Sequence, residues 1–187
     1  VKSVGVNFPD GLLVQGKYQL KPDTPFIPGM EVAGEIIKIG PNVSSLKIGD
    51  RVAALSQLSG YAEQAVVQEK SVFKIPSKMS FDDSCALLCA YGTSHYALKQ
   101  RANLKKNELL VILGASGSTG IAAIQIGKIM GAKVIAVSSN SEKQKIAKDN
   151  GADISIGYDN LKEELKSISN GKGIDAVSYT HLRAHET

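Results

Sequence analysis

The sequence predicts an α/β protein in which a strand-rich first part is followed by a doubly wound parallel sheet. Two observations carry this prediction. After residue 106, apolar runs of strand length alternate with segments at helical spacing, which is the order of a parallel sheet covered by helices. Residues 1–76 instead hold short apolar runs separated by Gly, Pro, Asn and Asp, which is typical of an all-β, barrel-like unit.

Composition and charge narrow the class of protein. The 187 residues are 43% hydrophobic and 21% charged, as in ordinary globular domains. The net charge of +4 comes from scattered lysines, so no nucleic-acid partner is indicated. No apolar run reaches the roughly 18 residues of a membrane span. We expect Cys85 and Cys89 to be reduced core residues, which favours an intracellular location, cytoplasmic in the first place and mitochondrial as the alternative.

The first part is expected to form strands at residues 32–39 and 60–67, and a further strand after a turn at Gly49-Asp50. Residues 7–11 read Asn-Phe-Pro-Asp-Gly. Because all but the phenylalanine are turn-forming residues, they predict a loop.

The pattern changes from strand to helix near residue 80. Ser80 is followed by Asp83 three residues later, and this pair predicts the start of a helix. The helix is expected to turn Cys85 and Cys89 inward. A second helix is expected to begin at Tyr91.

The second part is organised around a glycine-rich turn. Leu109–Leu113 is a continuous apolar run, predicted to be a buried parallel strand, and helical spacing follows over residues 121–130. Between them, Gly114, Gly117 and Gly120 recur every three residues. In dinucleotide-binding turns of this kind, the middle glycine lets N–H groups approach a pyrophosphate and the last lets the helix pack on the strand. A tight turn that binds nothing is the alternative.

The predicted strand at residues 133–137 indicates which dinucleotide is preferred. NAD sites usually place Asp or Glu near the end of this strand to bind the ribose 2′-OH, but here Ser-Ser-Asn-Ser follows. The hydroxyls of Ser138 and Ser139 and the ammonium of Lys143 can bond a 2′-phosphate, each bond contributing about 1.5 kcal/mol. NADPH is therefore the expected cofactor. Ser141, the last residue of this run, could instead be the N-cap of the helix that follows.

The remaining elements continue the alternation of strand and helix. Gly131 is expected to end the first helix. Further elements are expected as a helix at 141–150, a strand at 153–156, a helix at 160–169 and a strand from residue 174.

Several different short motifs are spread along nearly the whole chain. They are Val6–Asp10, Gly16–Tyr18, Pro28–Gly34, Gly49–Val52, Gly92-Thr93, Gly114–Gly120 and Gly151–Asp153. As a set they resemble the medium-chain dehydrogenase/reductase superfamily, in its NADPH:quinone oxidoreductase (zeta-crystallin-like) branch. The resemblance implies a partial GroES-like β-barrel domain at residues 1–86 and a partial Rossmann NADPH-binding domain at 87–177. Residues 178–187 are then a foreign tail.

The resemblance also implies a function and a site. It implies an enzyme that transfers hydride from NADPH to a quinone or an α,β-unsaturated carbonyl compound. Asn7 is placed near the nicotinamide ribose, and Tyr18 is the proton donor or else packs on the barrel surface. Thr93 is placed near the nicotinamide ring or is a helix N-cap, and Tyr158 lies beside the 2′-phosphate or is a strand-end aromatic. The cofactor turn then consists of Ala115, Ser116, Gly117, Ser118, Thr119 and Gly120.

No metal is expected. Zinc-dependent relatives carry Gly-His-Glu where this chain has Gly29-Met30-Glu31, and a neutral thioether is a poor ligand for zinc. The Cys-x-x-Cys run of the structural zinc lobe is absent as well. The enzyme is therefore expected to be zinc-independent.

Two departures from the family pattern stand out. Ser118 adds a side chain to a turn that usually reads Gly-Gly-Val-Gly, and residues 178–187 break the pattern of the fourth strand. We expect this tail, with His181 and His185, to be an artefact rather than a metal site. Since family proteins extend further at both ends, we expect a fragment without turnover by itself, and a homodimeric parent.

Two other functions stay open. An enoyl-thioester reductase would use Tyr18 as its acid. A non-catalytic NADPH-binding protein with a crystallin-like or RNA-binding role would show no turnover with any acceptor.

Overall fold

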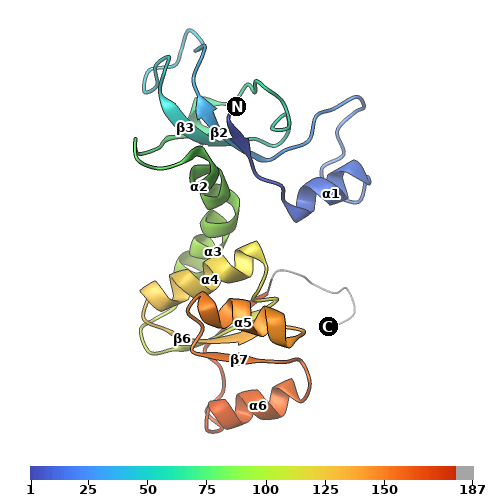
Figure 1. Ribbon diagram of the computed structural model, residues 1–187, viewed down its shortest axis with the longest axis vertical. Helices are drawn as coiled ribbons and strands as arrows, with labels where there is room; N and C mark the ends of the chain where they lie inside the picture. Colours follow the sequence, from blue (N-terminus) through green and yellow to red (C-terminus); the bar gives the residue numbers. More distant parts are fainter. Residues whose placement is uncertain (180–187) are drawn as a thin grey trace. The chain divides into compact units, whose positions relative to one another are not determined.

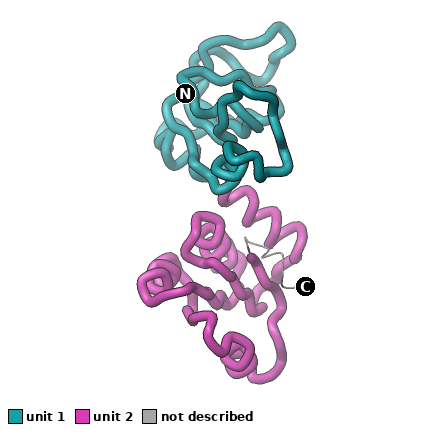
Figure 2. Tube along the Cα trace, turned by 90° about the vertical axis from the view of Figure 1, so that its right-hand side faces the viewer, with its two compact units in different colours: residues 1–89 teal, residues 90–187 magenta. Residues whose placement is uncertain are grey.

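The computed structural model describes residues 1–179 and divides into two compact units, Val1–Cys89 and Ala90–Thr187 (Figure 2). The expectations for residues 180–187, including His181 and His185, lie outside the described residues. Each unit is built around its own four-stranded sheet.

The first unit contains an antiparallel sheet in the order β1-β2-β3-β4, of which β2 and β3 are labelled in Figure 1. Its elements are β1 (Ser3–Val4), β2 (Glu31–Glu35), β3 (Arg51–Leu55), the 3-10 turn η1 (Glu69–Ser71) and β4 (Val72–Lys74). Ala33 of β2 lies opposite Ala53 of β3, and both pack against Cys85. β2 is shorter than the span 32–39 predicted from its apolar run.

The strand expected at residues 60–67 is wrong, because these residues form no strand. The N–H groups of Gly60 and Tyr61 donate to the carbonyls of Gly29 and Pro28, at 3.1 and 2.9 Å. Backbone donors used in this way are not available to a sheet ladder. A bend at residues 61–63 and irregular chain at 64–67 therefore replace the strand.

The loop expected at residues 7–11 is also wrong, because helix α1 (Phe8–Val14) begins there. Asn7 is its N-cap and forms a capping box with Asp10, and a proline lies in the first turn. The residues that favour turns are also those preferred at a helix N-terminus. In the helix, the side chains of Asp10 and Leu13 are buried.

One helical segment joins the two sheets along the chain. It consists of α2 (Phe81–Ala86), the π-helical turns η2 (Leu87–Tyr91), α3 (Gly92–His95) and the π-helical turns η3 (Tyr96–Arg101). Ser80 caps it as predicted, since its Oγ accepts from the N–H of Asp83 at 3.0 Å. The expected new start at Tyr91 is wrong, because the wider turns carry the helix through without a break.

The second unit contains the predicted parallel sheet, in the order β7-β6-β5-β8. Its strands are β5 (Leu109–Leu113), β6 (Lys133–Val137), β7 (Ile154–Ile156) and β8 (Ala176–Tyr179), and its helices are α4 (Ser118–Ile129), α5 (Ser141–Asp149) and α6 (Leu161–Ile168). Side chains of α4 and α5 pack against Leu110 and Val134, whereas those of α6 pack against Val111 and Ile135. Helices therefore cover both faces, and the doubly wound prediction is confirmed.

Within residues 1–179, no helix has the length and apolar character needed to cross a bilayer. Cys85 and Cys89 are free thiols, the first buried and the second half-buried. Burial raises the pKa of the Cys85 thiol to about 11, so this sulfur stays protonated at neutral pH.

Candidate functional site

The glycine turn lies at the carboxyl end of the parallel sheet in the second unit. β5 ends at Leu113, Gly114 turns the chain with a φ of 65°, and Gly117 is the N-cap of α4. Ala115 is fully buried, and its N–H donates to the carbonyl of Val137 at 3.2 Å. Ligands of open parallel sheets bind at this edge, so the turn has the expected location for a cofactor.

Gly117 and Gly120 meet different surroundings. A Cβ on Gly120 would lie 2.6 Å from the carbonyl oxygen of Gly114 and 2.7 Å from the Cα of Ala115. Only glycine therefore lets α4 pack this close to the end of β5. A Cβ on Gly117 would have its nearest neighbour at 3.5 Å, an ordinary contact, and Gly117 is exposed. The protein itself leaves open the space in front of Gly117.

The first turn of α4 offers hydrogen-bond donors at this open space. Within residues 1–179, no side chain caps this helix. Ser118 is exposed, whereas Ser116 and Thr119 are half-buried. The buried Ser94 of α3 donates from its Oγ to the carbonyl of Thr119 at 2.9 Å, which fixes the turn from behind. First-turn N–H groups without an acceptor form a site for a diphosphate.

The residues after β6 form a polar rim beside the turn. Lys143 Nζ donates to Ser139 Oγ at 3.4 Å, and both residues are exposed. Ser138 is instead 2% exposed, and its Oγ has no hydrogen-bond partner within the described chain. Asn140 is the N-cap of α5, since its side chain accepts from the N–H of Lys143, so the alternative role of Ser141 as N-cap is wrong.

Two further expected residues lie in the second unit. The hydroxyl of Tyr158 accepts from the N–H of Gly114 at 3.0 Å, so the structure brings this tyrosine to the glycine turn. Its side chain is 47% exposed. Thr93 is exposed within α3, in the middle of a continuous helical segment, so its alternative role as an N-cap is wrong.

In the first unit, Asn7 belongs to a buried polar cluster. Asn7 Nδ2 donates to Glu31 Oε1 at 2.8 Å, and the Asn7 N–H donates to Asp10 Oδ2 at 2.8 Å. Glu31 and Asp10 are each 3% exposed. Their other oxygens accept from the N–H groups of Cys89, at 2.7 Å, and Gly29, at 3.2 Å. The two carboxylates therefore tie together segments that are distant in sequence.

Tyr61 lies near this cluster. Burial, together with the negative charges of Asp10 and Glu31, raises the pKa of the Tyr61 hydroxyl to about 12. The hydroxyl is buried and makes no hydrogen bond of normal geometry within residues 1–179. Tyr61 is therefore a neutral phenol at any physiological pH.

Sequence reasoning missed Asp10, Glu31 and Tyr61. A signal was available for Asp10, since carboxylates are favoured in the first turn of a helix. The sequence carried none for Glu31, because carboxylates are rarely buried. Tyr18 follows the turn at Gly16, is half-buried, and makes no hydrogen bond to another described residue.

The residues present do not fit zinc. Both oxygens of Glu31 are occupied by N–H donors, and the neighbouring side chain is the thioether of Met30. No group of three or more His, Cys, Asp or Glu side chains within residues 1–179 is arranged to hold a metal ion.

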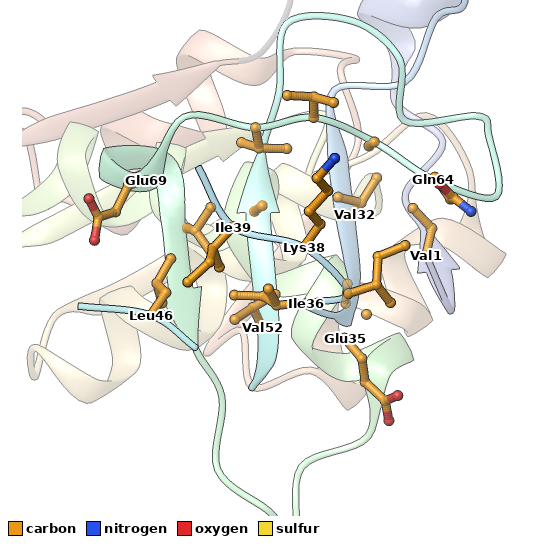
Figure 3. Close-up of a pocket in the computed structure, with 18 of the residues that line it drawn as sticks. Val1, Val32, Glu35, Ile36, Lys38, Ile39, Leu46, Val52, Gln64 and Glu69 are labelled. Carbon is orange, nitrogen blue, oxygen red and sulfur yellow. The ribbon is translucent and has the colours of Figure 1, made fainter. Parts of the chain in front are cut away.

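The first unit also contains a cavity of about 670 Å³ beside the sheet. Figure 3 shows apolar side chains around it, including Val32, Ile39 and Val52. Val32 and Val52 point to the face of the sheet opposite Ala33 and Ala53, since neighbours in a strand alternate. None of the expected site residues lines this cavity.

The fold and the turn together define a class, in which a strand-rich unit precedes a Rossmann-type parallel sheet with a glycine-rich turn at its carboxyl edge. Residues 1–77 match the alcohol dehydrogenase GroES-like domain, and residues 118–181 match the family described as zinc-binding dehydrogenase. The chain belongs to the medium-chain dehydrogenase/reductase superfamily, in its quinone oxidoreductase branch. The expected fold class, with GroES-like and Rossmann parts, is thereby confirmed.

Individual relatives agree with this assignment. The chain is 39% identical over 181 residues to the quinone oxidoreductase-like protein 2 homolog of Nematostella vectensis, covering 95% of this chain and 49% of that protein. Escherichia coli quinone oxidoreductase, solved in complex with NADPH, is 32% identical with a TM-score of 0.88, over 92% of this chain and 54% of that one. CurK enoyl reductase is 27% identical with a TM-score of 0.85, over 93% and 55%. The chain spans about half the length of the curated relatives that it matches.

Proposed function

We propose that this chain is the cofactor-binding part of a zinc-independent reductase that transfers hydride from NADPH to a quinone or an α,β-unsaturated carbonyl compound. The observation that carries the proposal is the uncapped first turn of α4 beside the Lys143–Ser139 pair, at the carboxyl edge of a parallel sheet. The first suits a diphosphate and the second suits an additional phosphate. The quinone oxidoreductase relatives support the same reaction class.

Each expected residue has a role in this proposal. The N–H groups of residues 118–120 bind the pyrophosphate, and Lys143, Ser139 and Tyr158 bind the 2′-phosphate. NADPH, when bound, supplies the hydride. Asn7 contacts the nicotinamide ribose. Tyr18 donates a proton from its phenol to the acceptor oxygen, which becomes a hydroxyl as the hydride adds.

In the same proposal, Thr93 contacts the nicotinamide ring, and Ala115 and Ser116 shape the turn. The buried Ser138 contributes through the shape of the rim rather than by direct contact, because its hydroxyl does not reach the surface. The full-length parent is proposed to be a homodimer, which light scattering on a size-exclusion column tests.

The cofactor preference is tested with a matched pair of lysine variants. Lys143→Gln should weaken NADPH binding about tenfold and leave NADH binding unchanged, because one hydrogen bond to a charged group contributes about 1.5 kcal/mol. Lys145→Gln is the control, since Lys145 lies on the same helix but pairs with Asp149 at 2.6 Å. Both dissociation constants are measured by fluorescence titration. Equal losses for NADPH and NADH, or equal effects of the two variants, would contradict the assignment of the rim.

The acceptor is tested on a full-length parent with Tyr18→Phe. An enoyl-thioester reductase is the second candidate, favoured by the similarity to CurK enoyl reductase. Turnover with quinones that survives Tyr18→Phe argues against Tyr18 as the acid, whereas loss of turnover limited to enoyl thioesters favours the second candidate. No turnover of the wild type with any acceptor favours a binding protein and overturns the reductase proposal.

A further inference from the structure

The buried carboxylate of Glu31 has a use beyond holding the fold together. We propose that Glu31 is a positioning residue that fixes the side-chain amide of Asn7 for contact with the cofactor. The proposal rests on the proposed function, in which Asn7 contacts the nicotinamide ribose. All of the geometry that carries it lies within the first unit.

The carboxylate joins two distant segments. Glu31 Oε1 accepts from Asn7 Nδ2 at 2.8 Å, and Oε2 accepts from the N–H of Cys89 at 2.7 Å. One oxygen thus holds the residue before α1, and the other holds η2. The Glu31 carboxylate therefore fixes the position of the Asn7 amide relative to η2.

Gly5 leaves room for this arrangement. A Cβ on Gly5 would lie 2.6 Å from Glu31 Cγ and 2.7 Å from Glu31 Cδ, and it would also overlap Oε1. Any other residue at position 5 would push the carboxylate away from Asn7. The absence of a side chain at Gly5 thus provides the space that the Glu31 carboxylate needs.

Both oxygens of Glu31 accept from N–H donors, and this decides which end of the Asn7 amide faces it. An ionised carboxylate only accepts hydrogen bonds, so it selects Nδ2 rather than Oδ1 of Asn7. Asp10 holds the backbone N–H of the same residue at 2.8 Å. No Lys, Arg or His side chain within residues 1–179 forms an ion pair with either carboxylate. Both are stabilised by N–H donors instead.

A purely structural cross-link would not need this charge. A buried charge is costly, and a neutral Gln of the same shape could join the same two segments at lower cost. Gln, however, has a single acceptor oxygen; when that oxygen accepts from the N–H of Cys89, its NH2 group faces Asn7 and favours the opposite orientation of the Asn7 amide. Two acceptor oxygens at position 31, each with its own N–H donor, therefore indicate a requirement for orientation of Asn7 rather than for stability alone.

The first test observes the contact itself. The side-chain amide resonances of Asn7 are followed by 15N NMR in this chain and in Glu31→Gln. We expect a clear shift and faster hydrogen exchange of the Asn7 amide in Glu31→Gln. Glu35→Gln, the same change at an exposed position of β2, should leave the amide unchanged. An Asn7 amide that does not respond to Glu31→Gln overturns the proposal.

The second test is a double-mutant cycle in the full-length parent. Glu31→Gln should raise KM for NADPH about tenfold with a smaller change in kcat, whereas in an Asn7→Ala background it should add less than twofold. Equal effects in both backgrounds overturn the positioning role. If Glu31→Gln does not fold, Gly5→Ala replaces it, since its Cβ displaces the same carboxylate.

The two proposals fail in distinguishable ways. A wild-type parent that binds no NADPH overturns the proposed function and this proposal with it. A wild-type parent that turns over normally, but with additive effects of the two substitutions, overturns only the positioning role of Glu31.

Discussion

Gly117 and Gly120 lie only three residues apart, but each is a glycine for a different physical reason. Gly120 is required by the protein itself, because backbone atoms of the glycine turn fill the space of a Cβ there. Gly117 is not required by the protein, because the nearest atom would be 3.5 Å away. A glycine that the fold does not need, in a turn that faces open space, is consistent with the pyrophosphate site proposed for this turn.

The pair gives a direct test at the scale of single residues. Gly117→Ala should fold normally but weaken binding of NADPH at least tenfold, because the methyl group occupies the space proposed for the pyrophosphate. Gly120→Ala should lower the free energy of unfolding by about 1–3 kcal/mol, because the overlap forces backbone movement. Urea unfolding and fluorescence titration measure the two effects. A Gly117→Ala variant that binds as the wild type does would show that the space has another use.

Tyr61 should ionise at a higher pH than an ordinary tyrosine. Burial and two nearby carboxylates hold its pKa at about 12, against about 10 for an ordinary tyrosine. Because the folded-state pKa is raised, the stabilisation is complete below pH 10 and is lost as the pH rises towards 12. Absorbance at 295 nm should therefore show one late titration, which Tyr61→Phe removes. Persistence of that step in Tyr61→Phe would assign it to another tyrosine.

At the scale of elements, Asp153 fastens the βαβ unit together. Its Oδ1 pairs with Lys128 of α4 at 2.5 Å, and its Oδ2 accepts from the N–H of Val134 in β6 at 2.6 Å. Burial works to raise the pKa of Asp153, but the bonds from Lys128 and Val134 outweigh it and the pKa is lowered. The carboxylate therefore contributes more as an anion than it costs to bury.

Asp153→Asn should lower the free energy of unfolding by about 1 kcal/mol, since the pair with Lys128 is partly exposed and screened. Because the folded-state pKa is lowered, the wild-type advantage is present above pH 4 and is lost as the pH falls through the folded pKa. Urea unfolding at pH 7 and pH 3 measures both. Asp149→Asn, in an exposed pair with Lys145, is the control and should change little. A pH-independent effect of Asp153→Asn would rule out the charge as its cause.

The sequence predicted the elements of the second unit better than those of the first. In β5 and β6, continuous apolar runs occupy strands that are buried on both faces, so composition alone marks them. In the first unit, Asn7 and Asp10 favour both a turn and a helix N-terminus, and residues 60–67 have the composition of a short strand without forming one. Local patterns there leave two outcomes of similar energy, and contacts with distant segments choose between them.

At the scale of the whole molecule, the two units differ in how much core each buries. In the first unit, the main buried cluster consists of Ala33, Ala53 and Cys85, with partly buried neighbours. In the second, large side chains are buried on both faces of the parallel sheet: Leu110, Ile112 and Ile135 from its strands, and Ile124 from α4. Buried apolar area is the main source of stability, so the second unit should be the more stable one.

Hydrogen exchange followed by mass spectrometry tests this difference. Amides of β5 and β6 should exchange more slowly than those of β2 and β3, because their opening exposes more apolar surface. Peptides from the two sheets within the same protein serve as controls for each other. Slower exchange in β2 and β3 would mean that the polar cluster around Glu31 stabilises the first unit more than its small core indicates.

The sequence by itself determined the order of strands and helices after residue 106, the glycine turn, and the absence of a carboxylate at the end of β6. These features are local, because hydrophobic periodicity and turn-forming residues act on the conformation of the same few residues that carry them. Only the tertiary structure decided that Glu31 meets Asn7 across 24 positions and that Tyr158 meets Gly114 across 44. A pattern in the sequence tells which side of an element is buried, but which distant segment covers it depends on packing of the whole unit.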